Sequence, residues 1–388
     1  MQSLYFYTSR QQKVVIVNNK RLKGGHNMNQ RSRSKVSVIG ILSLLLVSVF
    51  FVSAPLHAAV KATPPGMINS VLGPISPDKL GTTLVHEHFT FAYPGWFADA
   101  TIAPENFKAA LKTNLGVIKA AKAVGIKTII DATPNDTGGR NPELYKALAR
   151  KTGINIICST GLYTEEEGSP AYWKTRIVWG ADISKMMSEI FIREITQGIG
   201  KTGVKAGVIK VGTSPKMTSY EESVHKAAVM AQKATGVPII THTEGPTGGI
   251  EQADFLIKEG ADPKKVMIGH VSNSRDIEYH KAILAKGVYI AFDRLGLEVI
   301  TPTAVNVKNI AELCKLGYAN KIMLSHDTVN VWLGRPIALP EKYLPAFANW
   351  RIDHISQNVL PALKAQGVTD EQIKTMMVDN PRNLFLGL

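Results

Sequence analysis

The sequence predicts an α/β protein with a (β/α)8 barrel, and three observations lead to that fold. Short apolar runs rich in β-branched residues recur along the chain, and each is followed by a longer stretch with helical periodicity. The runs are apolar without interruption, as expected of parallel strands that are buried on both faces. There are eight such units, which is the number that closes this type of barrel.

The eight expected strands follow one another in chain order. They are Thr82–Val85, Lys127–Ala132, Asn155–Cys158, Gly207–Val211, Pro238–Thr241, Val266–Gly269, Val288–Phe292 and Lys321–Leu324. An open doubly wound sheet is the alternative, but no Gly-rich phosphate-binding fingerprint follows the first strand. Residues 59–388 are therefore expected to form one barrel domain, with a small hairpin within Met67–Gly81 at the barrel entrance.

The first 58 residues have the pattern of a secretory signal peptide. They contain eight Lys or Arg residues and no Asp or Glu, and the apolar run Val36–Val52 is followed by small residues around Ala58. Translation starting at Met28 would give a signal of more usual length. An uncleaved membrane anchor is the alternative, because a span needs roughly 20 apolar residues. The small residues favour cleavage, and the mature protein is expected in the periplasm or outside the cell, without stable membrane insertion.

The net charge and the two cysteines bear on the expected partners and on disulfide formation. Removal of residues 1–58 lowers the formal net charge from +14 to +6, because 14 − 8 = 6, and the remaining basic residues are scattered. Nucleic acid is therefore not an expected partner. Cys158 lies in a strand-like run and Cys314 in a helical one, so two buried free thiols are expected.

Ligand-type side chains occur where the expected strands end. In a (β/α)8 barrel, the carboxyl ends of the strands converge on one mouth, so these side chains should face a common space. In chain order the six residues are His86, His88, Lys210, His242, His270 and Asp327. Taken singly, each has an ordinary structural explanation; taken together, they predict a metal site with imidazole and carboxylate ligands.

The remaining histidines are interpreted differently. His225, His280 and His354 lie within helical patterns and are expected to be core residues. His326 is left open, because neighbouring residues on a strand point to opposite faces. His86 and His88, two residues apart on one strand, point to the same side and can reach one ion.

Lys210 is the unusual member of the set, because an ammonium group cannot bind a cation. Burial near cations lowers the pKa of a lysine, and a neutral amine can react with carbon dioxide to form a carbamate. A carbamate has two oxygens and can bridge two metal ions.

Six segments resemble the phosphotriesterase family of the amidohydrolase superfamily, over almost the whole mature chain. They are "TLVHEH", "GVIKVGTS", "GVPIITHTE", "MIGHVSNS", "LSHDT" and "VDNPRNLF". The resemblance implies a binuclear centre of two divalent transition-metal ions, zinc first, with cobalt, manganese or iron as alternatives. It implies that His86, His88 and Asp327 bind the buried ion and that His242 and His270 bind the exposed one. It also implies that Lys210, as N6-carboxylysine, bridges them and that the chain forms a homodimer.

The resemblance further implies a hydrolase in which water activated by the two ions attacks an ester and Asp327 accepts the proton. "FDRLGLE", residues 292–298, is similar to the lactonase branch, since the organophosphate hydrolases have His in place of Arg294. Tyr163 also stands where lactonases have a tyrosine, whereas Asn273 replaces the usual acidic residue. Trp332, with Leu333, is expected to form an apolar wall for the substrate.

The predicted function is therefore the opening of lactones, including acyl-homoserine lactones, with a secondary phosphotriesterase activity. The alternatives are an organophosphate triester hydrolase, a carboxylesterase on the same fold, and a non-catalytic protein that uses the metal centre for binding. The lactonase, the triester hydrolase and the carboxylesterase would each act on a small-molecule ester.

Overall fold

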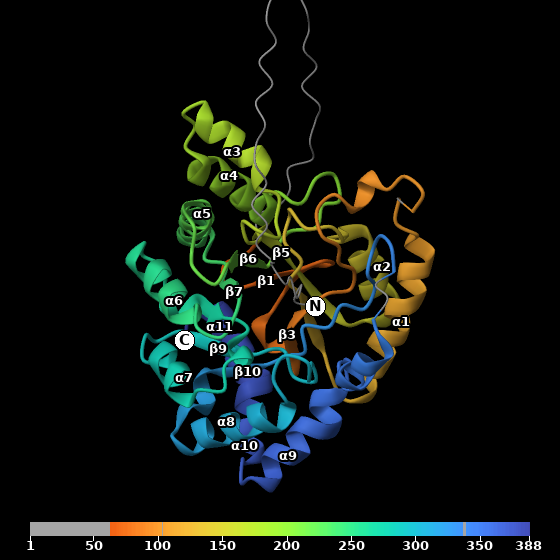
Figure 1. Ribbon diagram of the computed structural model, residues 1–388, viewed down its shortest axis with the longest axis vertical. Helices are drawn as coiled ribbons and strands as arrows, with labels where there is room; N and C mark the ends of the chain where they lie inside the picture. The colour runs from red at the N-terminus through yellow and green to blue at the C-terminus, as the bar shows by residue number, and fades with distance from the viewer. Residues whose placement is uncertain (1–62, 103, 337–338) are drawn as a thin grey trace, which may run out of the picture. The chain divides into compact units, whose positions relative to one another are not determined.

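Eight parallel strands form the centre of the protein. The structure is a computed structural model, and it describes residues 63–102, 104–336 and 339–388 (Figure 1). The strands are β3 (Thr83–Glu87), β4 (Thr128–Asp131), β5 (Asn155–Leu162), β6 (Val208–Thr213), β7 (Ile239–Thr243), β8 (Val266–Ile268), β9 (Tyr289–Phe292) and β10 (Ile322–Leu324). The predicted signal peptide, its start at Met28 and the alternative anchor all lie outside the described residues.

The strand order identifies the sheet as a barrel. Each strand pairs with the next one along the chain, from β3 to β10, and every pairing is parallel. The first and last strands meet where the Asp327 N–H donates to the His86 carbonyl (3.0 Å) and the His88 N–H donates to the Thr328 carbonyl (2.8 Å). A doubly wound sheet would reverse its order at a switch point. The predicted (β/α)8 barrel is therefore confirmed.

Helices surround the strands (Figure 1). They are α1 (Phe107–Ala123), α2 (Pro142–Thr152), α3 (Pro170–Val178), α4 (Ile183–Thr196), α5 (Ser219–Thr235), α6 (Gly249–Lys258), α7 (Ile277–Leu284), α8 (Thr303–Lys315), α9 (Leu360–Ala365), α10 (Asp370–Lys374) and α11 (Asn380–Leu386). Short 3-10 turns occupy Pro77–Lys79, Trp96–Ala98, Pro263–Lys265, Val271–Asn273, Tyr318–Lys321 and Glu341–Phe347, and π-helical turns occupy Ile355–Val359 and Thr375–Asp379.

Local sequence signals explain where these helices begin and end. Before α5, Thr218 and Glu221 form a capping box in which each side chain accepts a hydrogen bond from the other's backbone N–H. Gly236, with φ of 72°, ends the same helix in a left-handed conformation that suits glycine. In none of the described helices is there an apolar stretch long enough to cross a membrane.

A small hairpin, β1 (Ile68–Ser70) and β2 (Gly73–Ile75), precedes the barrel. The sequence predicts this hairpin, but its expected place at the barrel entrance is wrong. The Val71 N–H donates to the Ile156 carbonyl (2.9 Å), and the Asn69 amide donates to the Ala206 carbonyl (2.9 Å). Ile156 and Ala206 lie at the amino-terminal starts of β5 and β6, so the hairpin covers the end of the barrel opposite the predicted metal site.

Two apolar layers hold the barrel together. The larger one packs strands against helices and includes Cys158 and Cys314, which are buried free cysteines as expected. The smaller one fills the barrel interior and includes Ile68 and Leu80 from the amino-terminal end. Side chains of alternate strands filling the interior are typical of this fold.

Candidate metal centre

The structure brings all six predicted ligand residues to the carboxyl-terminal mouth of the barrel. His86 ends β3 together with Glu87, and His88 follows directly; Lys210 lies in β6 and His242 in β7. His270 follows β8, and Asp327 follows β10. All six are buried.

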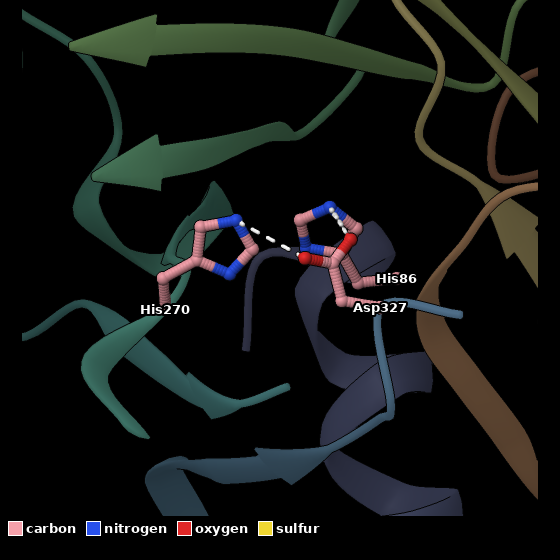
Figure 2. A group of neighbouring side chains, drawn as sticks. All are labelled: His86, His270 and Asp327. Atoms are coloured by element: carbon pink, nitrogen blue, oxygen red, sulfur yellow. Dashed lines mark ion pairs between the residues drawn. The ribbon is translucent and has the colours of Figure 1, made fainter. Parts of the chain in front are cut away.

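Asp327 is the centre of the group. Its Oδ1 lies 3.1 Å from His88 Nε2 and 3.4 Å from His86 Nε2, and its Oδ2 lies 3.7 Å from His270 Nε2. Figure 2 shows that His86 and His270 each turn a ring nitrogen toward this carboxylate. One ligand atom from each of these three residues lies within 4.8 Å of the others, which suits a single cation.

Lys210 and His242 lie next to two members of this group, His86 and His270. The Lys210 Nζ lies 3.0 Å from His86 Nε2 and donates to the Thr241 carbonyl at 3.1 Å. His242 Nδ1 lies 2.8 Å from His270 Nε2. Burial lowers the pKa of Lys210 from 10.5 to about 7, although Asp327 and Asp293 oppose this shift. A substantial share of this amine is therefore neutral at neutral pH.

The chemistry of the donors fits metal ions. Burial lowers the pKa of His86, His242 and His270, so these imidazoles are neutral and each keeps a lone pair for a cation. Burial would raise the pKa of Asp327, but the hydrogen bond with His88 and the charge of Arg294 hold it well below its ordinary value. The site therefore combines neutral imidazoles with an anionic carboxylate, as divalent transition metals prefer.

The backbone is strained at two of these ligands. Among the described residues, His270 and Asp327 are the non-glycine residues with positive φ, and both have φ of 57°. This left-handed conformation costs roughly 1–2 kcal/mol for an L-residue. Strain of this kind persists only where the surroundings enforce it, and it gathers at functional sites.

Asp293 orients two of the predicted ligands, although the sequence pattern does not single it out. Its Oδ2 accepts a hydrogen bond from His86 Nδ1 (2.7 Å), and its Oδ1 accepts from the His270 backbone N–H (2.7 Å) and Nδ1 (3.0 Å). An anionic acceptor at Nδ1 leaves the Nε2 lone pair free for a metal. The available signal was its position directly after the predicted strand Val288–Phe292.

A second polar group orients His88. The Thr133 hydroxyl lies 2.8 Å from His88 Nδ1, and Asp131 Oδ2 accepts from the Phe89 N–H (2.8 Å). Asp131 also accepts from the Tyr145 hydroxyl (3.0 Å). A charged residue inside the apolar run Lys127–Ala132 was the signal for this group.

The predicted substrate residues Tyr163 and Arg294 border the ligand group. The Tyr163 hydroxyl lies 3.0 Å from His242 Nδ1, and burial raises its pKa well above 10, so it remains a neutral donor. The Arg294 Nε donates to Asp327 Oδ2 at 2.9 Å, and its Nη1 donates to Asn273 Oδ1 at 3.4 Å. Asn273 thus accepts from Arg294 without adding a charge.

Trp332 lies in an aromatic cluster that the sequence only partly predicts. Its ring centroid is 5.6 Å from that of Phe91 and 6.3 Å from that of Tyr93. Phe91 is also 6.4 Å from Tyr163, and the Leu333 N–H donates to the Phe91 carbonyl at 2.9 Å. The segment after His88 and the loop after β10 therefore together form an apolar wall beside Tyr163.

The other histidines lie outside the group. His225 and His280 bond backbone carbonyls of Glu221 (2.7 Å) and Val271 (2.9 Å), as core residues do, and His354 is buried before the turn Ile355–Val359. His326, which the sequence left open, contacts Glu87 at 2.9 Å and accepts from the Ile355 N–H at 3.1 Å. It therefore points away from the ligands.

Comparison with known proteins gives a consistent answer. Residues 66–385 match the phosphotriesterase family model. A phosphotriesterase homology protein of Mycobacterium tuberculosis is 39% identical over 326 residues, covering 82% of this chain and 97% of that protein. The organophosphorus hydrolase of Deinococcus radiodurans is 44% identical, with a TM-score of 0.80, over 82% of this chain and 97% of the other.

A mutant PTE-like lactonase, also of Deinococcus radiodurans, is 42% identical, with a TM-score of 0.80, over 82% of this chain and 99% of the other. The chain is accordingly a hydrolase of ester bonds whose His and Asp residues form a metal-binding group. With a family model matched over nearly the whole barrel and the ligand group at its mouth, the chain belongs to the phosphotriesterase family.

Proposed function

We propose that the protein is a binuclear metal-dependent lactonase. His86, His88 and Asp327 would hold the buried ion, and His242 and His270 the exposed one. The support for this assignment is the grouping of imidazole nitrogens around Asp327 at 3.1–3.7 Å and the 2.8 Å approach of His242 to His270. Zinc is the first choice of metal for such ligands, and cobalt, manganese and iron are alternatives.

Lys210 would join the two halves as a carbamate. Its neutral amine nitrogen attacks the carbon of CO₂, a C–N bond forms as one C=O π bond opens onto oxygen, and one proton leaves the nitrogen for solvent. The reaction needs an unprotonated amine, and the pKa of about 7 produced by burial supplies one. The resulting anion carries two oxygens, one for each half of the group.

Divalent ions bound here would lower the pKa of a water molecule to near neutrality and polarise the oxygen of the ester under attack. Asp327 would take the proton that the attacking water loses and deliver it to the leaving alkoxide, so that no charge accumulates on either. Arg294, bonded to Asp327 Oδ2 at 2.9 Å, fixes the orientation of this carboxylate during the transfer.

The choice of a lactone depends on one observation, the protonated Tyr163 hydroxyl beside His242. A donor at this place can bind the single carbonyl oxygen of a planar ester. A tetrahedral phosphotriester carries three substituents besides the attacked oxygen, and it needs more room around the same point. The aromatic wall of Phe91 and Trp332 then suits an acyl or alkyl chain, as in an acyl-homoserine lactone.

A substrate panel tests the proposal. Purified protein loaded with zinc or cobalt would be assayed against aliphatic γ- and δ-lactones, acyl-homoserine lactones, aryl esters and aryl dialkyl phosphates. We expect the highest kcat/KM for a lactone. A kcat/KM for the phosphotriester that equals or exceeds every lactone value would contradict the proposal.

The second candidate is an organophosphate triester hydrolase. It is favoured by the 44% identity to the organophosphorus hydrolase of Deinococcus radiodurans. The same panel decides between the two, and a preference for aryl esters would instead favour a carboxylesterase. Binding of lactones without turnover of any substrate would favour a non-catalytic binding protein.

We also propose export to the periplasm or the medium, with cleavage near Ala58. The basic, apolar and small-residue segments of residues 1–58 support this proposal. Mass spectrometry of protein from the periplasmic fraction should give a chain that begins near residue 59. An intact amino terminus in the membrane fraction would favour the anchor.

A further inference from the structure

Glu87 is a buried carboxylate placed between two ligands of the proposed centre. It is the last residue of β3, it is 1% exposed, and it separates His86 from His88. Because side chains alternate along a strand, the Glu87 side chain points away from the ions that its neighbours would bind.

The Glu87 carboxylate accepts hydrogen bonds from both sides of Asp327. Its Oε1 accepts from the His326 N–H (2.9 Å), from His326 Nδ1 (2.9 Å) and from the Ser325 hydroxyl (2.8 Å). Its Oε2 accepts from the Thr328 N–H (2.8 Å) and hydroxyl (2.5 Å). The Asp327 N–H donates to the His86 carbonyl (3.0 Å). Three successive backbone N–H groups, 326 to 328, are therefore all bound by β3.

This pattern coincides with the strained backbone. Asp327 has φ of 57°, and the Glu87 carboxylate binds the residues directly before and after it. His270, the other left-handed ligand, has its backbone N–H bound by the Asp293 carboxylate at 2.7 Å. Each strained ligand is thus held by a buried carboxylate from another strand end.

We propose that Glu87 is a positioning residue: its carboxylate holds the left-handed turn at 326–328 so that Asp327 faces the imidazoles, and its loss weakens metal retention through Asp327. This proposal rests on the metal centre proposed above. It does not depend on which ester is the substrate.

Glutamate suits this task better than glutamine does. A carboxylate is an acceptor at both oxygens, and all five groups around Glu87 are able to donate to it. In Glu87→Gln one oxygen becomes an NH₂ donor that faces either the His326 N–H or the Thr328 N–H. A hydroxyl can rotate to accept, but a backbone N–H cannot. One side of the clamp, by which we mean the hydrogen bonds from the Glu87 carboxylate to residues 326 and 328, is therefore lost.

The test compares Glu87→Gln with a matched control, Glu221→Gln. Glu221 is also fully buried and accepts from the backbone N–H groups of Glu165 (2.9 Å), Ser214 (3.0 Å) and Thr218 (3.0 Å), but it bonds none of the six proposed ligands. Zinc-loaded proteins would be dialysed against graded chelator, and bound zinc would be measured by elemental analysis. Melting temperatures of the metal-free forms would report general damage.

We expect Glu87→Gln to lose zinc at about 10–100-fold lower chelator concentration than the wild type, the range known for residues that support metal ligands. Glu221→Gln should lower the melting temperature but keep the wild-type retention. Wild-type retention in Glu87→Gln, or an equal loss in Glu221→Gln, would overturn the proposal.

A double substitution tests the route through Asp327. In an Asp327→Asn background, adding Glu87→Gln should change zinc retention by less than about twofold, because coupled residues are not additive. Full additivity would overturn the positioning role. If Glu87→Gln does not fold, Thr328→Val removes one donor and should reduce retention by a few-fold, and unchanged retention there would also contradict the clamp.

The outcomes separate this proposal from the proposed function. A wild-type protein that retains none of zinc, cobalt, manganese and iron would refute the metal centre and the positioning role of Glu87 together. A wild-type protein that retains zinc but hydrolyses no lactone would refute only the lactonase, and the zinc measurements would still decide the role of Glu87.

Discussion

The amino-terminal end of the barrel is filled by apolar side chains, whereas the carboxyl-terminal end gathers buried charge. At the amino-terminal end, Ile68 and Leu80 are 4% and 0% exposed and belong to the interior apolar layer beneath the hairpin. At the other end, Lys210, Asp293 and Asp327 are 1%, 0% and 9% exposed within the same ring of strands.

This difference shows how one fold divides stability from function. Burial of apolar area at the amino-terminal end stabilises the barrel and requires no charged partner. Burial of charge at the carboxyl-terminal end costs free energy unless each group is paired, and there Glu87, Asp293 and Asp327 are paired with donors from other strand ends. The first end therefore supplies the rigidity on which the second depends.

The largest expected effect comes from Lys210→Ala at the carboxyl-terminal end. The substitution removes the proposed bridging anion, so we expect loss of one or both ions and a fall in kcat/KM of more than about 10²-fold. Elemental analysis and lactone assays measure both. The control is Lys205→Ala, three residues before the start of the same strand, β6, which should keep its metal. Full activity of Lys210→Ala without additives would show that Lys210 is no ligand.

The converse substitution is Leu80→Ala at the amino-terminal end. Leu80 is fully buried in the interior layer, so its truncation should lower the free energy of unfolding by about 2–5 kcal/mol. The kcat/KM of the folded, metal-loaded protein should remain within about twofold of wild type, because the site lies at the opposite end. Denaturant unfolding and steady-state assays measure the two quantities. A large loss of activity without loss of stability would remove the distinction between the ends.

Tyr163 distinguishes substrate recognition from metal binding at the carboxyl-terminal end. Tyr163→Ala and Tyr163→Phe should each lower the kcat/KM for lactones by about 10-fold or more, since both lose the donor beside His242. The kcat/KM for phosphotriesters should fall less, and metal content should stay at the wild-type level. If Tyr163→Phe keeps full lactonase activity, the ring and not the hydroxyl is the important group.

The pH dependence of reconstitution tests the burial of Lys210. Its pKa is about 7, below the ordinary 10.5, so the amine is largely neutral above pH 7 and largely protonated below it. At fixed dissolved CO₂, metal uptake by the metal-free protein should accelerate about 5-fold from pH 6 to pH 7 and level off above pH 8. An ordinary exposed lysine would give a rate that keeps rising toward pH 10, and that result would contradict the prediction.

The sequence predicts the strands, and which ligand-type side chains gather at the barrel mouth, because both depend on local patterns. All eight expected strands overlap observed ones, and strand ends alone were enough to select His86 and Asp327. The supporting carboxylates Glu87 and Asp293 were missed for a physical reason. Their partners lie more than 200 residues away in several cases, and periodicity does not report which distant donors a buried carboxylate meets.

The hairpin illustrates the same limit for the fold. Glycine and proline within Met67–Gly81 predict a turn, because these residues favour the required backbone angles. They contain no information on which end of the barrel the turn will cover. That depends on contacts such as the bond from the Asn69 amide to the Ala206 carbonyl, which joins residues far apart in the sequence.

The smallest expected effect comes from Thr218, a polar residue at the carboxyl-terminal end of the barrel. Its substitution shows whether polar residues there that bond no predicted ligand also affect metal binding. Thr218 caps α5 through a hydrogen bond from the Glu221 N–H (3.2 Å), and it bonds none of the six ligands. Thr218→Ala should lower the free energy of unfolding by about 1 kcal/mol, and Thr218→Ser should keep most of it, because serine retains the capping hydroxyl. Metal content and lactone kcat/KM should be unchanged in both variants. Denaturant unfolding gives the first quantity. A loss of metal in Thr218→Ala would mean that the β6–α5 turn supports the ligands as Glu87 and Asp293 do, and the functional region would then extend beyond the strand ends.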